Sequence, residues 1–179
     1  MKHTYVIGID GSGIDEAIRG VNERKEWLRR KTDELAKRLA DYGVSKAQLN
    51  FSTALYDGIN DVSVEPAEKK GDGWYVVKAN GSAVLFIEFG TGVHYPDSHP
   101  EPNGFSHGTY GKGLGANDYW FYTGQPGNAG GVLATDPKTG YVRPNTTITH
   151  GNPANMSMYN AVKELEQNFE SIAREVFSD

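Results

Sequence analysis

The sequence predicts an α+β fold in which a small antiparallel sheet packs with a long N-terminal helix and a C-terminal helix. Apolar residues at helical spacing mark both ends of the 179-residue chain, and short runs rich in β-branched and aromatic residues lie between them. No strand–helix–strand crossover of suitable length is present, which argues against a parallel sheet. Glycine and proline gather in one long central segment. We therefore expect a single domain over residues 1–179 with one long Gly/Pro-rich insertion.

The first long element is a helix, expected over residues 13–43 after a short strand at Thr4–Ile9. Ser12 and Asp15 have the spacing of a capping box at the start of a helix. Gly43 suits the left-handed residue that often closes a last turn.

The apolar pattern of this helix runs further than a small core can cover. Side chains recur every seven positions, with two more on the intervening seam: Ile14, Val21, Leu28, Leu35 and Tyr42, then Ile18 and Leu39. About thirty residues of helix measure roughly 45 Å. We expect the Ile14–Leu28 half to overhang the core.

A β hairpin and a distinctive motif are expected within residues 52–92. Asp61–Glu65 and Gly73–Ala79 have the composition of strands, and the charged turn Lys69–Asp72 joins them as an antiparallel pair. The segment Ala83–Gly92, with the sequence A-V-L-F-I-E-F-G-T-G, follows the hairpin.

Residues 93–151 form the predicted insertion of loops and a hairpin. Thirteen of the 22 glycines lie from Gly90 to Gly151. Within the insertion, Asn117–Tyr122 is expected to be a strand, and Gly131–Ala134 is expected to pair with Gly140–Arg143. Few aliphatic side chains are available to offset the entropy of ordering this segment.

The C-terminal helix is expected over residues 152–178. Asn152 is placed to cap it, and Pro153 suits the first helical position. Its apolar positions alternate in steps of four and three: Met158, Val162, Leu165, Phe169, Ile172 and Val176. The stretch from Lys163 to Asp179 has two basic and five acidic residues, so this helix is predominantly acidic.

Composition excludes several classes of function. The net charge of −5 argues against a general phosphate-binding surface and sequence-specific nucleic-acid binding. The absence of cysteine excludes disulfides and thiol catalysis. No apolar run approaches the roughly 18 residues of a membrane span. The first ten residues lack the apolar region of a signal peptide, so we expect folding in a cytoplasm.

Motifs for catalysis and cofactor binding are weak or missing. Gly8–Gly13 lies between a predicted strand and a helix, but it has neither the spacing nor the lysine of a phosphate-binding loop. No Gly-x-Ser-x-Gly nucleophile elbow is present. We predict neither an enzyme nor a bound cofactor.

One cluster of side chains has the chemistry of metal ligands: His94, Asp97, His99, Glu101 and His107. Zinc requires three or four such groups converging at about 2 Å. These residues lie in a predicted loop without ligand spacing, so we predict no metal. A metal-dependent hydrolase using His94, His99 and His107 remains an alternative.

Two surfaces have the composition of contact sites. Arg24 and Lys25 belong to a basic patch that is either a solvated face or a contact with an acidic neighbouring subunit. In the aromatic run Tyr119–Tyr122, one strand face is expected in the core and the other in an interface. A glycan-binding module that uses Trp120 and Tyr122 is a further alternative.

The segment Ala83–Gly92 resembles the (I/V)-E-F-G-T-G hallmark of a family of tailed-phage proteins, variously called tail-component, head–tail joining, tail-completion, neck or minor capsid proteins. The order of elements is also similar, from the long first helix to the Gly-x-Pro-Ala element at Gly151–Ala154 that opens the last helix. Many members have Pro-Phe-Leu-Arg-Pro-Ala before that helix, and this chain departs from them there. The resemblance covers residues 14–178 but explains the insertion least.

The resemblance implies a structural virion protein of the neck or upper tail, assembled in the host cytoplasm. It implies a ring of several copies around the DNA channel, in contact with head-completion or connector, tail-terminator and tail-tube proteins. From the residues themselves, Glu88 is expected either to cap backbone N–H groups or to bridge to another subunit. The predicted subunit-interface residues are Ile14, Ile18, Val21, Arg24, Lys25, Glu88, Trp120 and Tyr122.

Overall fold

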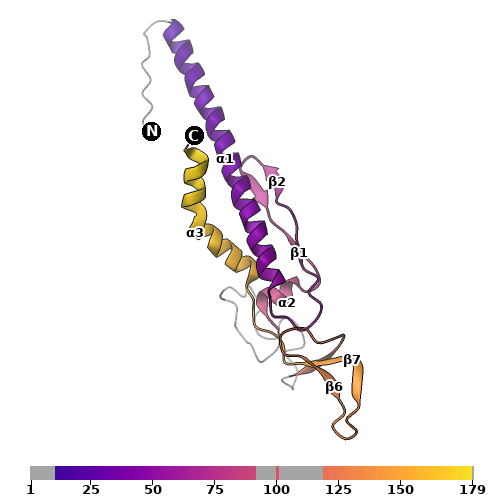
Figure 1. Cartoon of the computed structure of the whole chain (residues 1–179). Helices are drawn as coiled ribbons and strands as arrows, with labels where there is room; N and C mark the ends of the chain where they lie inside the picture. Colours follow the sequence, from indigo (N-terminus) through magenta and orange to yellow (C-terminus); the bar gives the residue numbers. More distant parts are fainter. Residues whose placement is uncertain (1–10, 92–99, 101–118, 179) are drawn as a thin grey trace.

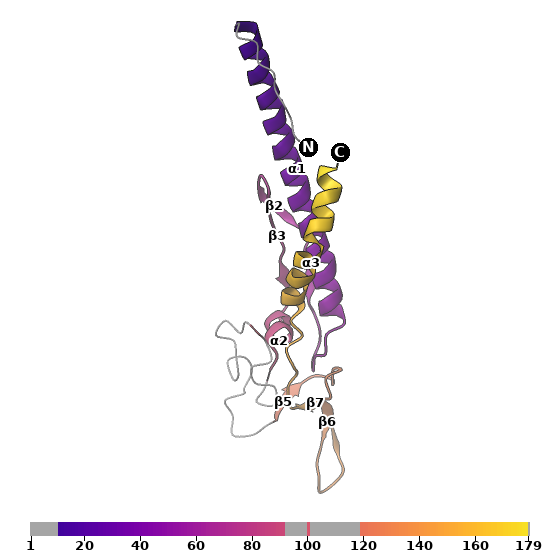
Figure 2. The ribbon, with the colours of Figure 1, turned by 90° about the vertical axis from the view of Figure 1, so that its left-hand side faces the viewer.

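The computed structural model describes residues 11–91, 100 and 119–178, which form an elongated molecule (Figure 1). Helix α1 (Gly11–Ser52) is its longest element, and α3 (Ser157–Phe177) lies alongside the C-terminal part of α1, from Trp27 to Asn50. Three small antiparallel sheets complete the fold, one of them at the end opposite the N-terminus of α1 (Figure 2). The predicted α+β class is confirmed. The predicted strand Thr4–Ile9 lies outside the described residues.

Helix α1 is longer than predicted, because Gly43 does not end it. The helix continues to Ser52 and has 42 residues, a length of roughly 63 Å. Gly43 is buried, and a Cβ at that position would lie 3.5 Å from Cδ1 of Leu165 in α3. The glycine therefore lies where the two helices approach closely, and the helix continues through the buried residues Ala47 and Phe51.

Helix α3 begins later than predicted, at Ser157, and Asn152 does not cap it. Met156 precedes the helix in a left-handed conformation, with φ of 54°. Asn152 is 1% exposed and belongs to the connection that leads into the helix. Its amide group bonds to Thr91 and Phe86, so a polar residue that looked like a helix cap serves instead as a tertiary link.

The predicted hairpin is confirmed as an antiparallel ribbon in two parts. Strand β1 (Ser63–Val64) pairs with β4 (Ala79–Asn80), and β2 (Glu68–Gly71) pairs with β3 (Trp74–Val76). The turn lies at Asp72 and Gly73, so most of the predicted turn Lys69–Asp72 belongs to β2. Gly73 supplies the positive φ of 69° that this turn requires.

An aspartate of α1 holds the ribbon against the helix. The Asp33 carboxylate accepts hydrogen bonds from Lys69 Nζ at 2.8 Å and from the Gly73 N–H at 3.0 Å. The hydrogen bond from Lys69, followed by that from Gly73, keeps the pKa of Asp33 below its ordinary value. The ribbon therefore covers α1 near its middle.

The main hydrophobic core lies where α1 ends, beneath α2 (Val84–Phe89). Phe51, Ala54, Ala83 and Ile87 are almost completely buried there, and Met158 of α3 packs against them. The start of α2 is held by Asp61, whose carboxylate accepts the Ser82 N–H at 2.8 Å and the Ala83 N–H at 3.0 Å. The motif segment is thus a short helix inserted into the core.

The described part of the insertion forms a three-stranded antiparallel sheet. Strand β7 (Val142–Thr149) lies between β5 (Trp120–Thr123) and β6 (Val132–Thr135). The predicted partner of Gly131–Ala134 was Gly140–Arg143, but β7 runs on to Thr149, so Val132 pairs with Ile148 and Leu133 with Thr147. Buried Asp57 joins this sheet to the end of α1, an attachment that the sequence did not indicate. Its carboxylate accepts bonds from the Gly131 N–H at 2.9 Å and the Thr149 hydroxyl at 2.6 Å.

Candidate functional site

The N-terminal part of α1 overhangs the rest of the described molecule, as the sequence predicted. It projects beyond both α3 and the β2–β3 ribbon (Figures 1 and 2). Along it, Ile14, Ile18 and Val21 are 49%, 55% and 57% exposed. Trp27 marks the end of the overhang, because its ring meets that of Phe177 in α3 at 5.8 Å between centroids. From Gly11 to Glu26, about 24 Å of helix therefore carries an exposed apolar stripe.

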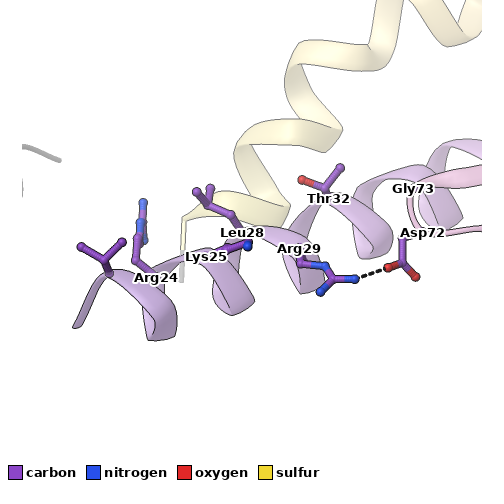
Figure 3. A pocket seen from close by; sticks show the side chains of 8 residues that line it. Arg24, Lys25, Leu28, Arg29, Thr32, Asp72 and Gly73 are labelled. Carbon is purple, nitrogen blue, oxygen red and sulfur yellow. Dashed lines mark hydrogen bonds and ion pairs between the residues drawn. The ribbon is translucent and has the colours of Figure 1, made fainter. Parts of the chain in front are cut away.

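The apolar stripe continues into a groove of about 600 Å³ beside the β2–β3 turn. Figure 3 shows Arg24, Lys25, Leu28 and Arg29 following one another along α1 at this groove. Its far end is closed by an ion pair between Arg29 and Asp72, with 2.7 Å between Nη2 and Oδ2. The hydrogen bond to Asp72 raises the pKa of Arg29 above its ordinary value.

The cations along this stretch make the surface basic. The Arg24 guanidinium lies 3.7 Å from the centre of the Trp27 ring, which fixes it beside the stripe. Lys25 and Arg30 are exposed. From Arg24 to Lys31 the helix carries five basic residues and one acidic residue. An apolar stripe that ends in fixed positive charge is suited to binding an amphipathic acidic surface.

One edge of the apolar stripe of α3 is a second exposed apolar surface. Val176 is 1% exposed and Ala161 is 4% exposed. Val162 and Phe169 are 50% and 48% exposed. Part of the apolar stripe of α3 is therefore buried, while Val162 and Phe169 on the same stripe stay about half exposed.

Glu88 has the first of its two predicted roles, because it caps α3. Its carboxylate accepts the Met158 N–H at 2.8 Å and the Tyr159 N–H at 3.0 Å. These N–H groups belong to the first turn of α3, which has no acceptor within the helix for them. Glu88 is 6% exposed. Glu88, which was predicted to lie in a subunit interface, therefore makes a contact within its own chain.

Two further residues of the motif, Gly90 and Thr91, contact the connection that leads into α3. Thr91 donates its hydroxyl to Oδ1 of Asn152 at 2.8 Å, and the Thr91 N–H bonds to the Asn152 carbonyl oxygen at 2.9 Å. Gly90 has φ of 76°, and a Cβ there would lie 2.6 Å from the backbone nitrogen of Ala154. A side chain at Gly90 would push the two segments apart. The motif is thus a latch that holds the start of α3.

Trp120 and Tyr122 lie on the half-buried face of β5, whereas Phe121 between them is 50% exposed. With Tyr56 and Phe86 they line a cavity of about 530 Å³. Tyr122 donates its hydroxyl to the Gln125 carbonyl oxygen at 2.9 Å, which fixes its ring. The aromatic run therefore alternates between two strand faces, and the predicted interface residues Trp120 and Tyr122 are on the less exposed one.

The candidate metal ligands His94, Asp97, His99, Glu101 and His107 lie outside the described residues. Within residues 11–91, 100 and 119–178, no group of three His, Cys, Asp or Glu side chains could hold a metal ion. None of the helices described there is long and apolar enough to cross a membrane.

Comparison with protein-family models, curated proteins and solved structures found no match to this chain.

Proposed function

We propose that this chain is a structural protein of the neck or upper tail of a tailed phage. In this proposal it acts by assembly, without a chemical step, as one subunit of a ring that joins or completes the head–tail connection. Its contacts are with further copies of itself and with head-completion or connector, tail-terminator and tail-tube proteins.

The overhang of α1 is the observation that carries the proposal. A helix that exposes three β-branched apolar side chains in a row leaves unburied surface that water disfavours. The first 16 residues of α1 project well beyond the core. A subunit of an assembly has a use for such a rod, because a neighbour can bury it.

The latch between α2 and α3 supports the resemblance on physical grounds. In this chain the Glu of the motif bonds to the first turn of α3, and its Gly and Thr lie against the connection that leads into this helix. A motif that fixes the angle of a helix is valuable where many copies must repeat one geometry. The net charge of −5 is compatible with a channel through which DNA passes without being held.

The decisive experiment replaces two stripe residues in the phage or prophage that encodes the chain. We expect the Ile18→Asp/Val21→Asp double variant to fold but to stay out of particles, so that heads and tails fail to join. Electron microscopy of lysates and protein analysis of purified particles measure this result. Circular dichroism of the purified variant verifies its folding.

Leu49→Asp is the matched control, because Leu49 lies on the same helix and is also 55% exposed, but near its other end. The control variant is expected to enter particles normally. Normal head–tail joining by the double variant would contradict the proposed use of the overhang. A chain that is absent from wild-type particles would refute a structural role in the virion altogether.

A glycan-binding module is the second candidate, favoured by the aromatic cavity at β5. This cavity is lined by Tyr56, from the segment after α1, and by Trp120 and Tyr122 of β5. Aromatic rings are common contacts for sugars. Binding to a panel of immobilised glycans, lost in Trp120→Ala, would support this candidate. No binding by the wild-type chain would dismiss it.

A further inference from the structure

We infer that the α1 overhang of one copy packs on the exposed apolar edge of α3, at Val162 and Phe169, of a second copy, and that this is the subunit contact of the proposed ring. The inference rests on the proposed function for its biological setting but not for its physical argument. Each chain has one exposed apolar stripe at each of these places, so one head-to-tail contact covers both.

The two stripes match in length and in spacing. Ile14, Ile18 and Val21 follow steps of four and three along α1. Val162 and Phe169 on α3 are also seven residues apart, which is about 10.5 Å of helix. All five side chains are between 48% and 57% exposed. Side chains with this spacing interdigitate when two helices lie side by side.

Charges of opposite sign lie at the end of the overhang stripe that is nearer the core and beside the apolar residues of α3. The overhang stripe ends at Arg24 and Lys25, whereas Glu166 and Glu170 lie between and after the apolar residues of α3. Both glutamates are exposed and pair with residues of their own helix, Glu166 with Lys163 at 3.0 Å and Glu170 with Arg174. Exposed pairs of this kind are worth little, so a neighbouring cation can replace or share them.

A contact between unlike surfaces propagates from copy to copy, and it forms a ring when the rotation closes. Each copy then contributes its overhang to one neighbour and its α3 to the other. One such contact buries few side chains, so an isolated pair of copies is weakly held. Ring closure adds a contact without further loss of translational freedom, which favours the closed assembly over the dimer.

Two other occupants are possible for the overhang. In an antiparallel pair of overhangs, Asp15 of one copy would face Arg24 of the other, so that arrangement also balances charge. It would leave Val162 and Phe169 exposed, however, and it would end at a dimer. The second alternative is that a different protein covers the stripe. The exposed α3 face favours the contact with α3.

Cysteine cross-linking distinguishes these arrangements cleanly, because the chain contains no cysteine of its own. Two full-length single variants, Ile18→Cys and Phe169→Cys, are mixed and treated with a short thiol-specific cross-linker. We expect the mixed dimer to exceed both homodimers, and a chain carrying both substitutions to give a ladder of oligomers. Leu49→Cys replaces Ile18→Cys as the control and is expected to give background cross-linking.

Charge reversal provides an independent measurement by analytical ultracentrifugation. Arg24→Glu/Lys25→Glu is expected to weaken self-association by at least about tenfold, because like charges then face one another. Adding Glu166→Lys/Glu170→Lys to the same chain is expected to restore it. A merely structural effect of either pair would not be rescued by the other.

Three results would overturn the inference: a dominant Ile18→Cys homodimer, no self-association of the purified wild-type chain, or no rescue by the second charge reversal. These results are separate from a failure of the proposed function. A chain that forms the α1–α3 contact but never enters particles keeps the interface and loses the phage assignment. A chain that enters particles without forming the α1–α3 contact would support the phage assignment and refute the interface.

Discussion

The two halves of α1 have the same apolar spacing but opposite surroundings. In the C-terminal half, Ala47 and Phe51 are completely buried against α2 and α3. In the N-terminal half, Ile14, Ile18 and Val21 are about half exposed. The comparison teaches that spacing identifies the face of a helix that is available for packing, whereas the partner is decided by which elements come within reach.

The largest expected difference between the two halves is in stability. Ile87→Ala, which shortens a completely buried side chain of α2, should lower the free energy of unfolding by about 2–5 kcal/mol. Ile18→Ala in the overhang should change it by less than about 0.5 kcal/mol. Urea denaturation of the monomer measures both values. Similar losses at the two positions would show that the overhang belongs to the folding core.

The latch is the next feature to test. Glu88→Ala should cost roughly 2–4 kcal/mol, because two N–H groups at the start of α3 lose their buried acceptor. Glu88→Gln keeps one amide oxygen and should cost less. Urea denaturation compares the two variants, and amide exchange at Met158 and Tyr159 locates the effect. Unchanged exchange there would contradict the capping role.

The effect of Gly43→Ala on stability depends on the backbone conformation of residue 43. Within a helix, Gly43→Ala should stabilise the chain by about 0.5–1 kcal/mol, since alanine has the higher helix propensity and its Cβ meets Leu165 at an ordinary contact distance. A left-handed Gly43 that ended the helix would make the same substitution destabilising. A shift of the thermal midpoint to lower temperature would therefore contradict the continuous α1.

The smallest effect is expected at the ribbon beside α1. Hydrogen bonds from Lys70 and then Lys78 lower the pKa of Glu68 from 4.5 to about 2. The charged carboxylate therefore stabilises the fold above pH 4.5, and this contribution is lost as the pH falls towards 2. NMR titration of Glu68 measures the pKa. In Lys70→Gln the value should rise towards 4.5, and an unchanged value would show that Lys70 is not the cause.

Much of the fold was predictable, because local patterns decide it. The 3.6-residue period identified both long helices, and the turn residues identified two hairpins within the described residues, although not the pairing register of the second. The boundaries at Gly43 and Asn152 were wrong for one reason. Glycine and asparagine have strong local preferences at helix ends, but here Leu165 and Thr91 provide tertiary partners that outweigh them.

For the candidate site, too, some features follow from local sequence patterns and others from tertiary contacts. By itself the sequence determined the apolar stripe Ile14–Val21, its basic neighbours and the excess length of the first helix, since these follow from composition and period. Only the tertiary structure decided that α3 stops near Trp27, that Val162 and Phe169 remain exposed, and that Glu88 is used within the chain. Burial depends on which distant segments meet, and a single helical period contains no information about its partner.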